Sequence, residues 1–291
     1  MIEQALYEHL IRQPLLSEYL TTYNETLAVF NQKAPADPDE LWNNGPQYPR
    51  LVFFVDLQGD PARTMGGSLA VDIQCPEDGV PPEELEPLVR DLIHGWFFSN
   101  GTFATAAQWR ASNYFTEPTE LVVGCTVAFD LLAFPVLTTY EPDVIDRLNE
   151  WTDEKEGLHA INYAALPAAA WRPENGESAV YWRLVKDDPA GWIPDTYQTI
   201  WRTATVRGHI FSQDIQTAEK VARNLITGLY AAKRLKRAGE APVMVNRRNA
   251  ADLSSDPLRA GQLTVEATYG VIVHYGTNET LNNIEVQRGE I

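Results

Sequence analysis

The sequence predicts an α+β fold made of two tandem copies of a small domain, each with an antiparallel or mixed sheet packed against helices. The segment RDLIHGWF at residues 90–97 recurs as RNLITGLY at residues 223–230. The elements predicted around these two segments follow in the same order. The length of 291 residues leaves room for about two domains of ~145 residues each. We therefore predict a first domain over residues 1–140 and a second, diverged copy over residues 141–291.

The first copy is predicted to contain a helix, two strands, a second helix and a long strand. Apolar residues at helical spacing predict an amphipathic helix over residues 2–12. Residues 51–55 and 68–74 are predicted strands, the second because apolar and polar residues alternate there. Proline in the first turn, followed by glutamates, predicts a helix over residues 82–98. Renewed alternation predicts a closing strand over residues 121–134.

The second copy is predicted to repeat this order. A helix begins near residue 144, and strands are predicted over residues 180–189 and 203–211. The central helix begins at residue 215, with Asp214 as its N-cap, and ends before Gly239. A closing strand is expected over residues 262–275. The repeated segment equates Leu92 with Leu225 and Ile93 with Ile226, and all four are expected to be buried on the sheet.

The net charge of −17 is divided unevenly between the halves. Residues 1–140 carry 6 basic and 19 acidic side chains, or −13, against −4 for residues 141–291. This acidity argues against a protein that coats nucleic acid. It is compatible with an acidic pore wall that DNA passes without binding, or with a charge that only maintains solubility. No apolar run approaches the ~18 residues of a membrane span, and the first residues lack the pattern of a signal peptide, so we expect a cytosolic protein.

The sequence contains none of the catalytic or cofactor-binding motifs that we sought. The glycine-rich residues 59–67 lack the Gly-Lys-Ser/Thr of a phosphate-binding loop, and the five histidines are scattered. We therefore expect no enzymatic activity, no cofactor and no metal. Cys75 and Cys125 fall on predicted strands, and the sequence leaves open whether they are reduced packing residues or a disulfide.

Two segments of the second copy are candidate contact surfaces. The loop of residues 191–198 is unusually apolar, so its tip either contacts a partner or packs back on its own domain. A basic cluster in the last turns of the central helix either neutralises the helix dipole or binds an acidic neighbour, such as the first half of another copy. The candidate interface residues are Arg63, Trp192, Ile193, Tyr197, Lys233, Arg234, Lys236, Arg237, Arg247 and Arg248.

The predicted unit resembles the tail terminator, or tail completion, proteins of long-tailed bacteriophages. The resemblance lies in the N-terminal helix, the Tyr48-Pro49 pair that leads into a strand, the glycine-rich segment of residues 59–67 and the helix that ends near Gly95. It covers most of residues 1–134 and, more weakly, 141–275. This chain is about twice the usual length of the family.

The resemblance implies a structural virion protein that forms a ring on the tail tube, ends tube growth and docks the head connector. The implied partners are further copies of the chain, the tail tube protein and the head–tail connector, with DNA only as passing cargo and no membrane. Three chains could imitate a six-domain ring, or six chains could form a ring with an added tier. The protein would be assembled in the host cytoplasm and located in the tail or neck of the virion. The alternatives are another adaptor, neck, tube or baseplate component, or an enzyme with an unfamiliar site.

Overall fold

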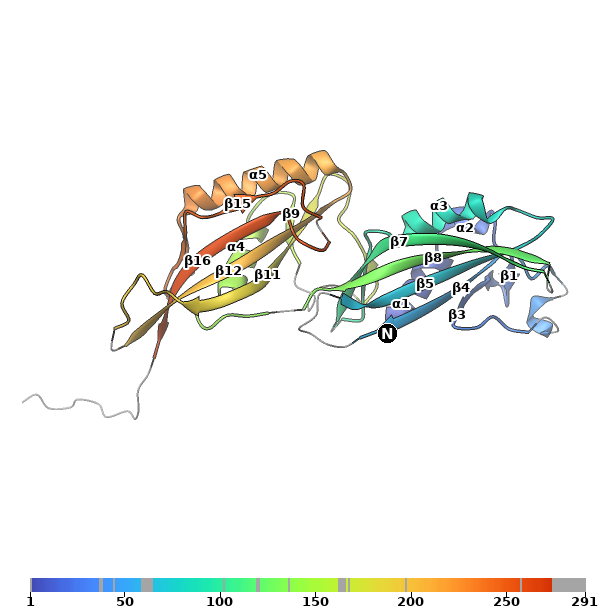
Figure 1. Cartoon of the computed structure of the whole chain (residues 1–291), viewed down its shortest axis with the longest axis horizontal. Coiled ribbons are helices and arrows are strands. Elements are labelled where there is room, and N and C mark those ends of the chain that lie inside the picture. The colour runs from blue at the N-terminus through green and yellow to red at the C-terminus, as the bar shows by residue number, and fades with distance from the viewer. Residues whose placement is uncertain are drawn as a thin grey trace, which may run out of the picture.

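The chain folds as an α+β protein in which two seven-stranded sheets each pack against helices, as the sequence predicts (Figure 1). The described residues also form a small two-stranded sheet. The computed structural model describes residues 2–36, 39–43, 45–58, 65–101, 103–118, 121–135, 137–161, 166, 168–196, 198–256 and 258–273. No helix among these residues is long and apolar enough to cross a membrane. Three predicted features lie outside the described residues: Arg63, Tyr197 and the last two residues, 274 and 275, of the predicted second closing strand.

The first half builds a mixed sheet that packs against its α-helices. Its elements are α1 (Ile2–Ile11), α2 (Pro14–Ser17), β1 (Thr22–Tyr23), β2 (Thr26–Leu27), β3 (Val29–Asn31), the 3-10 helix η1 (Glu40–Trp42), β4 (Arg50–Leu57), β5 (Met65–Pro76), α3 (Pro82–Ile93), β6 (Phe97–Ser99), β7 (Ala104–Glu117) and β8 (Val122–Ala133). The strand order from one edge is β3-β4-β5-β8-β7-β6. Only β3 and β4 pair in parallel, and the other pairs are antiparallel.

The second half builds a sheet with the matching order. Its elements are α4 (Val144–Asp153), β9 (Leu158–Ala160), β10 (Ala170–Trp171), β11 (Ser178–Pro189), β12 (Thr199–Ser212), α5 (Ile215–Ala232), β13 (Arg234–Leu235), β14 (Val243–Val245), β15 (Ala250–Ala251) and β16 (Leu263–Ile272). The order is β9-β11-β12-β16-β14-β13, and again only the first pair is parallel. Six strands of each sheet therefore correspond in order, whereas β15, which also pairs with β16, and β10 have no counterpart. The division at residues 140 and 141 remains a prediction.

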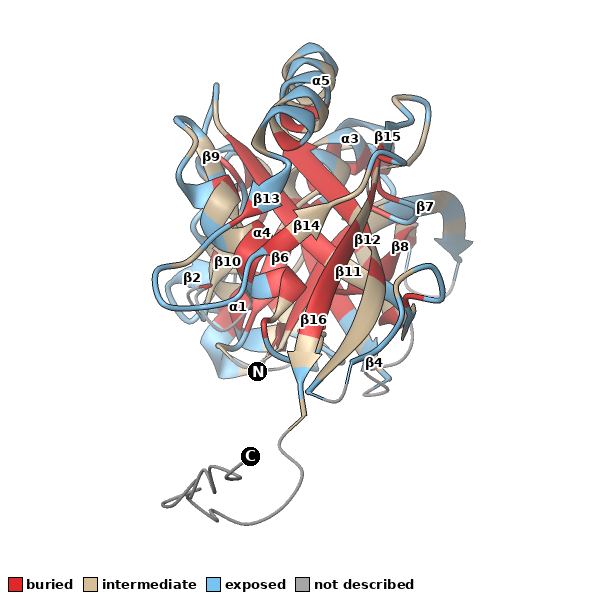
Figure 2. Ribbon diagram, turned by 90° about the vertical axis from the view of Figure 1, so that its left-hand side faces the viewer, coloured by how far each residue is buried: buried red, intermediate tan, exposed pale blue. Residues whose placement is uncertain are grey.

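Each half has its own apolar core between the sheet and its helices. In the first half, α1 and α3 bury Leu6, Leu10 and Val89 against alternate residues of β4, β5 and β8. In the second half, α4 and α5 bury Leu148 and Leu225 in the same manner. Buried residues concentrate on β11, β12 and β16, while the outer side of α5 is exposed (Figure 2). The alternation of apolar residues along the strands and their 3.6-residue spacing along the helices therefore determine which faces of the sheet and the helices pack together.

The predicted starts of the two central helices, at residues 82 and 215, are confirmed, but their predicted ends were wrong. Helix α3 ends at Ile93 rather than at residue 98, because His94 is extended and Gly95 takes a left-handed conformation with φ +77°. Helix α5 ends at Ala232, and Lys233 is its left-handed C-cap with φ 57°. The second copy of the repeated segment is therefore wholly helical, whereas half of the first copy is not.

The alignment of the helices within the repeat was also wrong. Leu92 and Ile226 are only half-buried, whereas Ile93 and Leu225 are buried. The buried positions agree when Val89 is matched with Leu225 and Ile93 with Leu229. This alignment differs from that of the repeated letters by three residues, close to one helical turn. The similar letters therefore do not occupy equivalent positions on the two sheets.

A third core cluster joins the two halves. Phe97 and Phe134 of the first half pack against Tyr181 and Phe211 of the second, with the rings of Phe97 and Phe211 4.8 Å apart. Strand β10, from the second half, pairs with β6 and extends the first sheet. The sheets consequently follow one another along the long axis, with α3 and α5 on the same side (Figure 1).

Polar contacts reinforce this junction. Arg259 forms an ion pair with Asp130, whose side chain is 8 % exposed, and donates from Nε to Gln108 at 2.7 Å. Gln108 in turn donates to Asp256 at 2.7 Å. Arg110 lies 3.4 Å from Asp130 on the other side. The carboxylate of Asp130 is therefore held between one arginine from each half.

Candidate functional site

The apolar loop of residues 191–198 forms the tip of the β11–β12 hairpin. The amide of Trp201 donates to the Asp195 carboxylate at 2.9 Å, and the amide of Thr196 donates to the Thr199 carbonyl at the same distance. These bonds hold the loop while Trp192 remains 67 % exposed. Ile193 is half-buried. Trp192 thus projects from the loop without packing back on the domain, which favours the contact interpretation of this residue.

Beside this loop lies an open groove of about 1230 Å³ on the second half. Its lining includes Trp192 and the basic residues Lys186, Lys233, Arg234, Arg247 and Arg248. Two carboxylates, those of Asp188 and Glu266, also line it. Five cations against two anions give the groove a positive balance in a chain that is strongly acidic overall. The structure thus brings five predicted interface residues into one surface, which we call the basic groove.

The basic groove is built on well-fixed backbone. The hydroxyl of Tyr230 on α5 donates to the carbonyls of Arg247 at 2.9 Å and Asn249 at 2.8 Å. The Asn249 side chain accepts from the amide of Glu266 on β16 at 2.9 Å. These bonds anchor the segment that carries Arg247 and Arg248. Among the described residues, neither of these arginines forms an ion pair, so both charges can act on a partner.

The remaining two members of the predicted basic cluster lie elsewhere. Lys236 and Arg237 line a second groove, of about 680 Å³, with α4. Arg237 forms ion pairs with Asp146, Glu150 and Glu240. The hydrogen bond from Arg237 lowers the pKa of Glu150 and raises that of Arg237. Arg237 therefore attaches residues 237–240 to α4.

The prediction that this cluster crowds the last turns of the central helix was wrong. Lys233 caps α5 and lines the basic groove, and the chain then turns into β13. Arg234 lines both grooves, whereas Lys236 and Arg237 line only the second one. Lys186 was missed as a member of the basic groove. Its only sequence signal was a charge on a predicted strand, which does not reveal what lies across the sheet.

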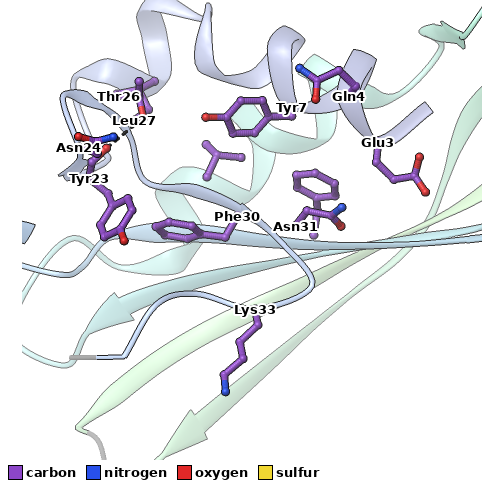
Figure 3. A pocket seen from close by; sticks show the side chains of 12 residues that line it. Glu3, Gln4, Tyr7, Tyr23, Asn24, Thr26, Leu27, Phe30, Asn31 and Lys33 are labelled. Atoms are coloured by element: carbon purple, nitrogen blue, oxygen red, sulfur yellow. Dashed lines mark hydrogen bonds between the residues drawn. The ribbon is translucent and has the colours of Figure 1, made fainter. Parts of the chain in front are cut away.

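A third cavity, of about 450 Å³, lies in the first half between α1, the β1–β2 hairpin and β3. The rings of Tyr7, Tyr23 and Phe30 border it, whereas Lys33 extends away from it (Figure 3). Burial and a hydrogen bond to Asp39 raise the pKa of Tyr23. The aromatic and amide side chains of this lining suit a packing contact more than acid–base chemistry.

The two cysteines of the chain are buried in the first half. Cys75 and Cys125 are buried and unbonded to each other, and burial raises their pKa to about 12 and about 11. Both are therefore thiols rather than reactive thiolates at neutral pH. Within the described part of the chain, no three His, Cys, Asp or Glu side chains gather closely enough to hold a metal ion.

Comparisons with known proteins give no relative. No family model matches the chain, and neither a curated protein nor a solved structure matches it. The functional argument accordingly depends on the sequence and the geometry alone.

Proposed function

We propose that this chain is a structural virion protein that forms a ring at the end of a bacteriophage tail tube, terminates tube growth and joins the tail to the head connector. The observation that carries this proposal is the repeated unit, in which two sheets share one strand order. The first half also has the helix, Tyr-Pro strand, central helix and closing strand of the tail terminator resemblance. Residues 1–140 and 141–291 are then two copies of one assembly domain.

The basic groove is the proposed contact surface for an acidic neighbour. The first half carries −13, so a second copy or another acidic virion protein would be attracted to Arg247 and Arg248. Trp192 supplies the large aromatic surface that interfaces commonly bury at their centres. A contact that pairs unlike surfaces is head-to-tail, and such contacts close into rings when the rotation permits.

The partners follow from this role. Three or six chains would form the ring, with the tail tube protein on one side and the head–tail connector on the other. DNA would pass through the lumen without specific binding, because an acidic wall repels phosphate. The protein would lie in the tail or neck of the virion. The second candidate is another adaptor, neck, tube or baseplate component, because the same sheets and surfaces would serve such assemblies equally well.

Electron microscopy of the purified chain tests the ring directly. Closed rings of uniform size are expected, while monomers or unclosed filaments would contradict the proposal. A second test uses the combined substitutions Trp192→Ala, Arg247→Glu and Arg248→Glu in a particle-assembly complementation assay. The chain should fold but no longer cap tails. Lys220→Glu, on the exposed side of α5, changes charge outside the groove and should leave assembly intact. Normal tails from the triple variant would exclude the basic groove as the contact surface.

A further inference from the structure

The first half has a cavity that the second half does not repeat. This cavity, of about 450 Å³ between α1, the β1–β2 hairpin and β3, is bordered by the rings of Tyr7, Tyr23 and Phe30 (Figure 3). We call it the aromatic cavity. In the second half, α4 is followed directly by β9, so the described residues there include no hairpin that could form an equivalent wall.

The walls of the aromatic cavity are fixed within the chain itself. The ring of Tyr23 packs edge-on against Phe30 at 5.4 Å and against the buried Trp42 at 4.8 Å. The amide of Asn24, in the turn between β1 and β2, donates to the Leu41 carbonyl at 3.1 Å. These contacts attach the hairpin to η1. A surface that is already ordered loses little conformational freedom when a partner binds it.

The second half has a projecting aromatic side chain that the first half does not repeat. Trp192, at the tip of the β11–β12 hairpin, is 67 % exposed. Residues 58–64, which join the equivalent strands β4 and β5, include no aromatic residue. The β11–β12 tip lies at the end of the long axis away from the first half (Figure 1). Trp192 therefore cannot reach the aromatic cavity of its own chain, but it can reach that of a neighbouring copy.

An indole ring suits the aromatic cavity in size and chemistry. The volume of about 450 Å³ lies within the range of pockets that enclose ligands larger than indole. Edge-to-face contacts with the surrounding rings stabilise a buried aromatic side chain beyond its apolar area. A buried indole N–H requires an acceptor, and the side-chain oxygens of Glu3 and Asn31, which both line the cavity, can provide one.

The charges beside the two surfaces are opposite. Glu3 lines the aromatic cavity, and Glu25 is exposed in the turn between β1 and β2. Lys33 also belongs to the lining, but its side chain extends away from the cavity (Figure 3). Trp192 lines the basic groove, where five cations lie beside two carboxylates. A contact between the two surfaces would bring an acidic rim against a basic one.

We propose that Trp192 of one chain inserts into the aromatic cavity of the next copy and anchors a head-to-tail contact. The projecting tryptophan and the cavity lie in different halves, so each copy meets two neighbours through unlike surfaces, and such contacts close into a ring when the rotation permits. The desolvated ring supplies most of the affinity, and the charges around it set the orientation. The inference rests on the proposed ring, since it names the contact between successive chains.

Sedimentation velocity on the purified full chain tests this contact. Thr26 is exposed and lines the cavity, so Thr26→Trp places an indole there and should raise the dissociation constant of assembly by about tenfold or more. Trp192→Ala should weaken assembly by a similar factor. The two substitutions together should weaken it no further, because they remove the same contact. Thr116→Trp, at an exposed strand position outside the cavity, is the matched control and should assemble like the parent. Circular dichroism checks that each variant folds.

Chemical cross-linking tests the proximity of the two surfaces. A side chain added at Gly191, beside the tryptophan, has open space around it, so Gly191→Cys is tolerated. A chain with Gly191→Cys and Thr26→Cys should form covalent multimers with a short bismaleimide, whereas each single variant should remain a single chain. The native Cys75 and Cys125 are buried and do not compete. Gly191→Cys combined with Thr116→Cys is the control and should give no multimers.

The outcomes separate this inference from the ring itself. If electron microscopy shows rings but Thr26→Trp assembles like the parent and the cysteine pair does not cross-link, the aromatic cavity is wrong and the ring stands. If Trp192→Ala weakens assembly but Thr26→Trp does not, Trp192 is buried at another surface and the cavity is not its receptor. A parent chain that stays monomeric contradicts both proposals.

Discussion

The two halves share one strand order, but they treat the strand after the central helix in opposite ways. In the first half, β6 carries Phe97, which is buried against the second half, and Phe98, which is buried in the core of the first half, and β10 pairs with this strand. In the second half, β13 carries Arg234 at the position of Phe97, and this arginine is exposed. One backbone framework can therefore present a core strand or a charged edge, depending on what covers it.

The largest expected contrast is between these two equivalent positions. Phe97→Ala should lower the free energy of unfolding by about 3–5 kcal/mol, because it empties the centre of the cluster that joins the halves. Arg234→Ala should change it by no more than about 0.5 kcal/mol, since the side chain is exposed. Urea denaturation of both variants measures the difference. Similar losses of unfolding free energy in the two variants would mean that β6 and β13 do not differ in their contribution to stability.

A second prediction distinguishes between the two alignments of the central helices, by repeated letters or by buried positions. Leu225→Ala should cost about 2–5 kcal/mol, as expected for a leucine that is 2 % exposed. Leu92→Ala should cost only about 1 kcal/mol, because Leu92 is half-buried. Thermal and urea unfolding of the two variants provide the measurement. Equal costs would favour the alignment of the repeated letters over that of the buried faces.

The polar part of the junction should contribute less than its apolar part. Arg259→Ala removes one of the two arginines beside the buried Asp130 carboxylate and should cost about 1–2 kcal/mol. Arg223→Ala is a suitable control, because its ion pair with Glu219 lies on the exposed side of α5. A loss for Arg259→Ala no greater than for the control would show that Arg259 does not stabilise the junction.

The smallest expected effect is a pH dependence confined to the first half. Burial lowers the pKa of His9 below its ordinary value of 6.5, and its Nε2 lies 2.8 Å from the Leu92 carbonyl oxygen. The unfolded chain then binds the proton more tightly, so this stability is present above pH 6.5 and is lost as the pH falls through the lowered pKa.

The free energy of unfolding, followed from about pH 7.5 to about pH 5, measures this dependence. It should decrease less steeply in His9→Gln than in the parent. His94, whose pKa burial also lowers, remains in both proteins and supplies the residual slope. Trp151 is the eighth residue of α4, as His9 is of α1. Its side chain does not titrate, so Trp151→Phe should leave the pH profile unchanged. Parallel slopes for the parent and His9→Gln would exclude His9 as the source.

The sequence by itself determined the central helices and strands of each half and their order, but it did not show the strands β3, β6, β7, β9, β10, β13, β14 and β15. The period of the apolar residues, the N-cap at Asp214 and the proline start of α3 are local signals, and the helices and strands follow them. The exposed tryptophan of the β11–β12 loop was also predictable, because a hairpin tip has few neighbours to cover it. The same local signals did not show where α3 ends, since the extended chain after Gly95 is stabilised by its pairing in the sheet.

Only the tertiary structure decided which charges act together. Lys233 and Lys236 are three residues apart, yet they face different grooves because the chain reverses at the C-cap of α5. Lys186 joins the basic groove from a strand far away in the sequence. Strand β10 likewise leaves its own half for the sheet of the other. Such placements depend on which surfaces remain uncovered after both sheets have packed, and that is a property of the whole chain rather than of any segment.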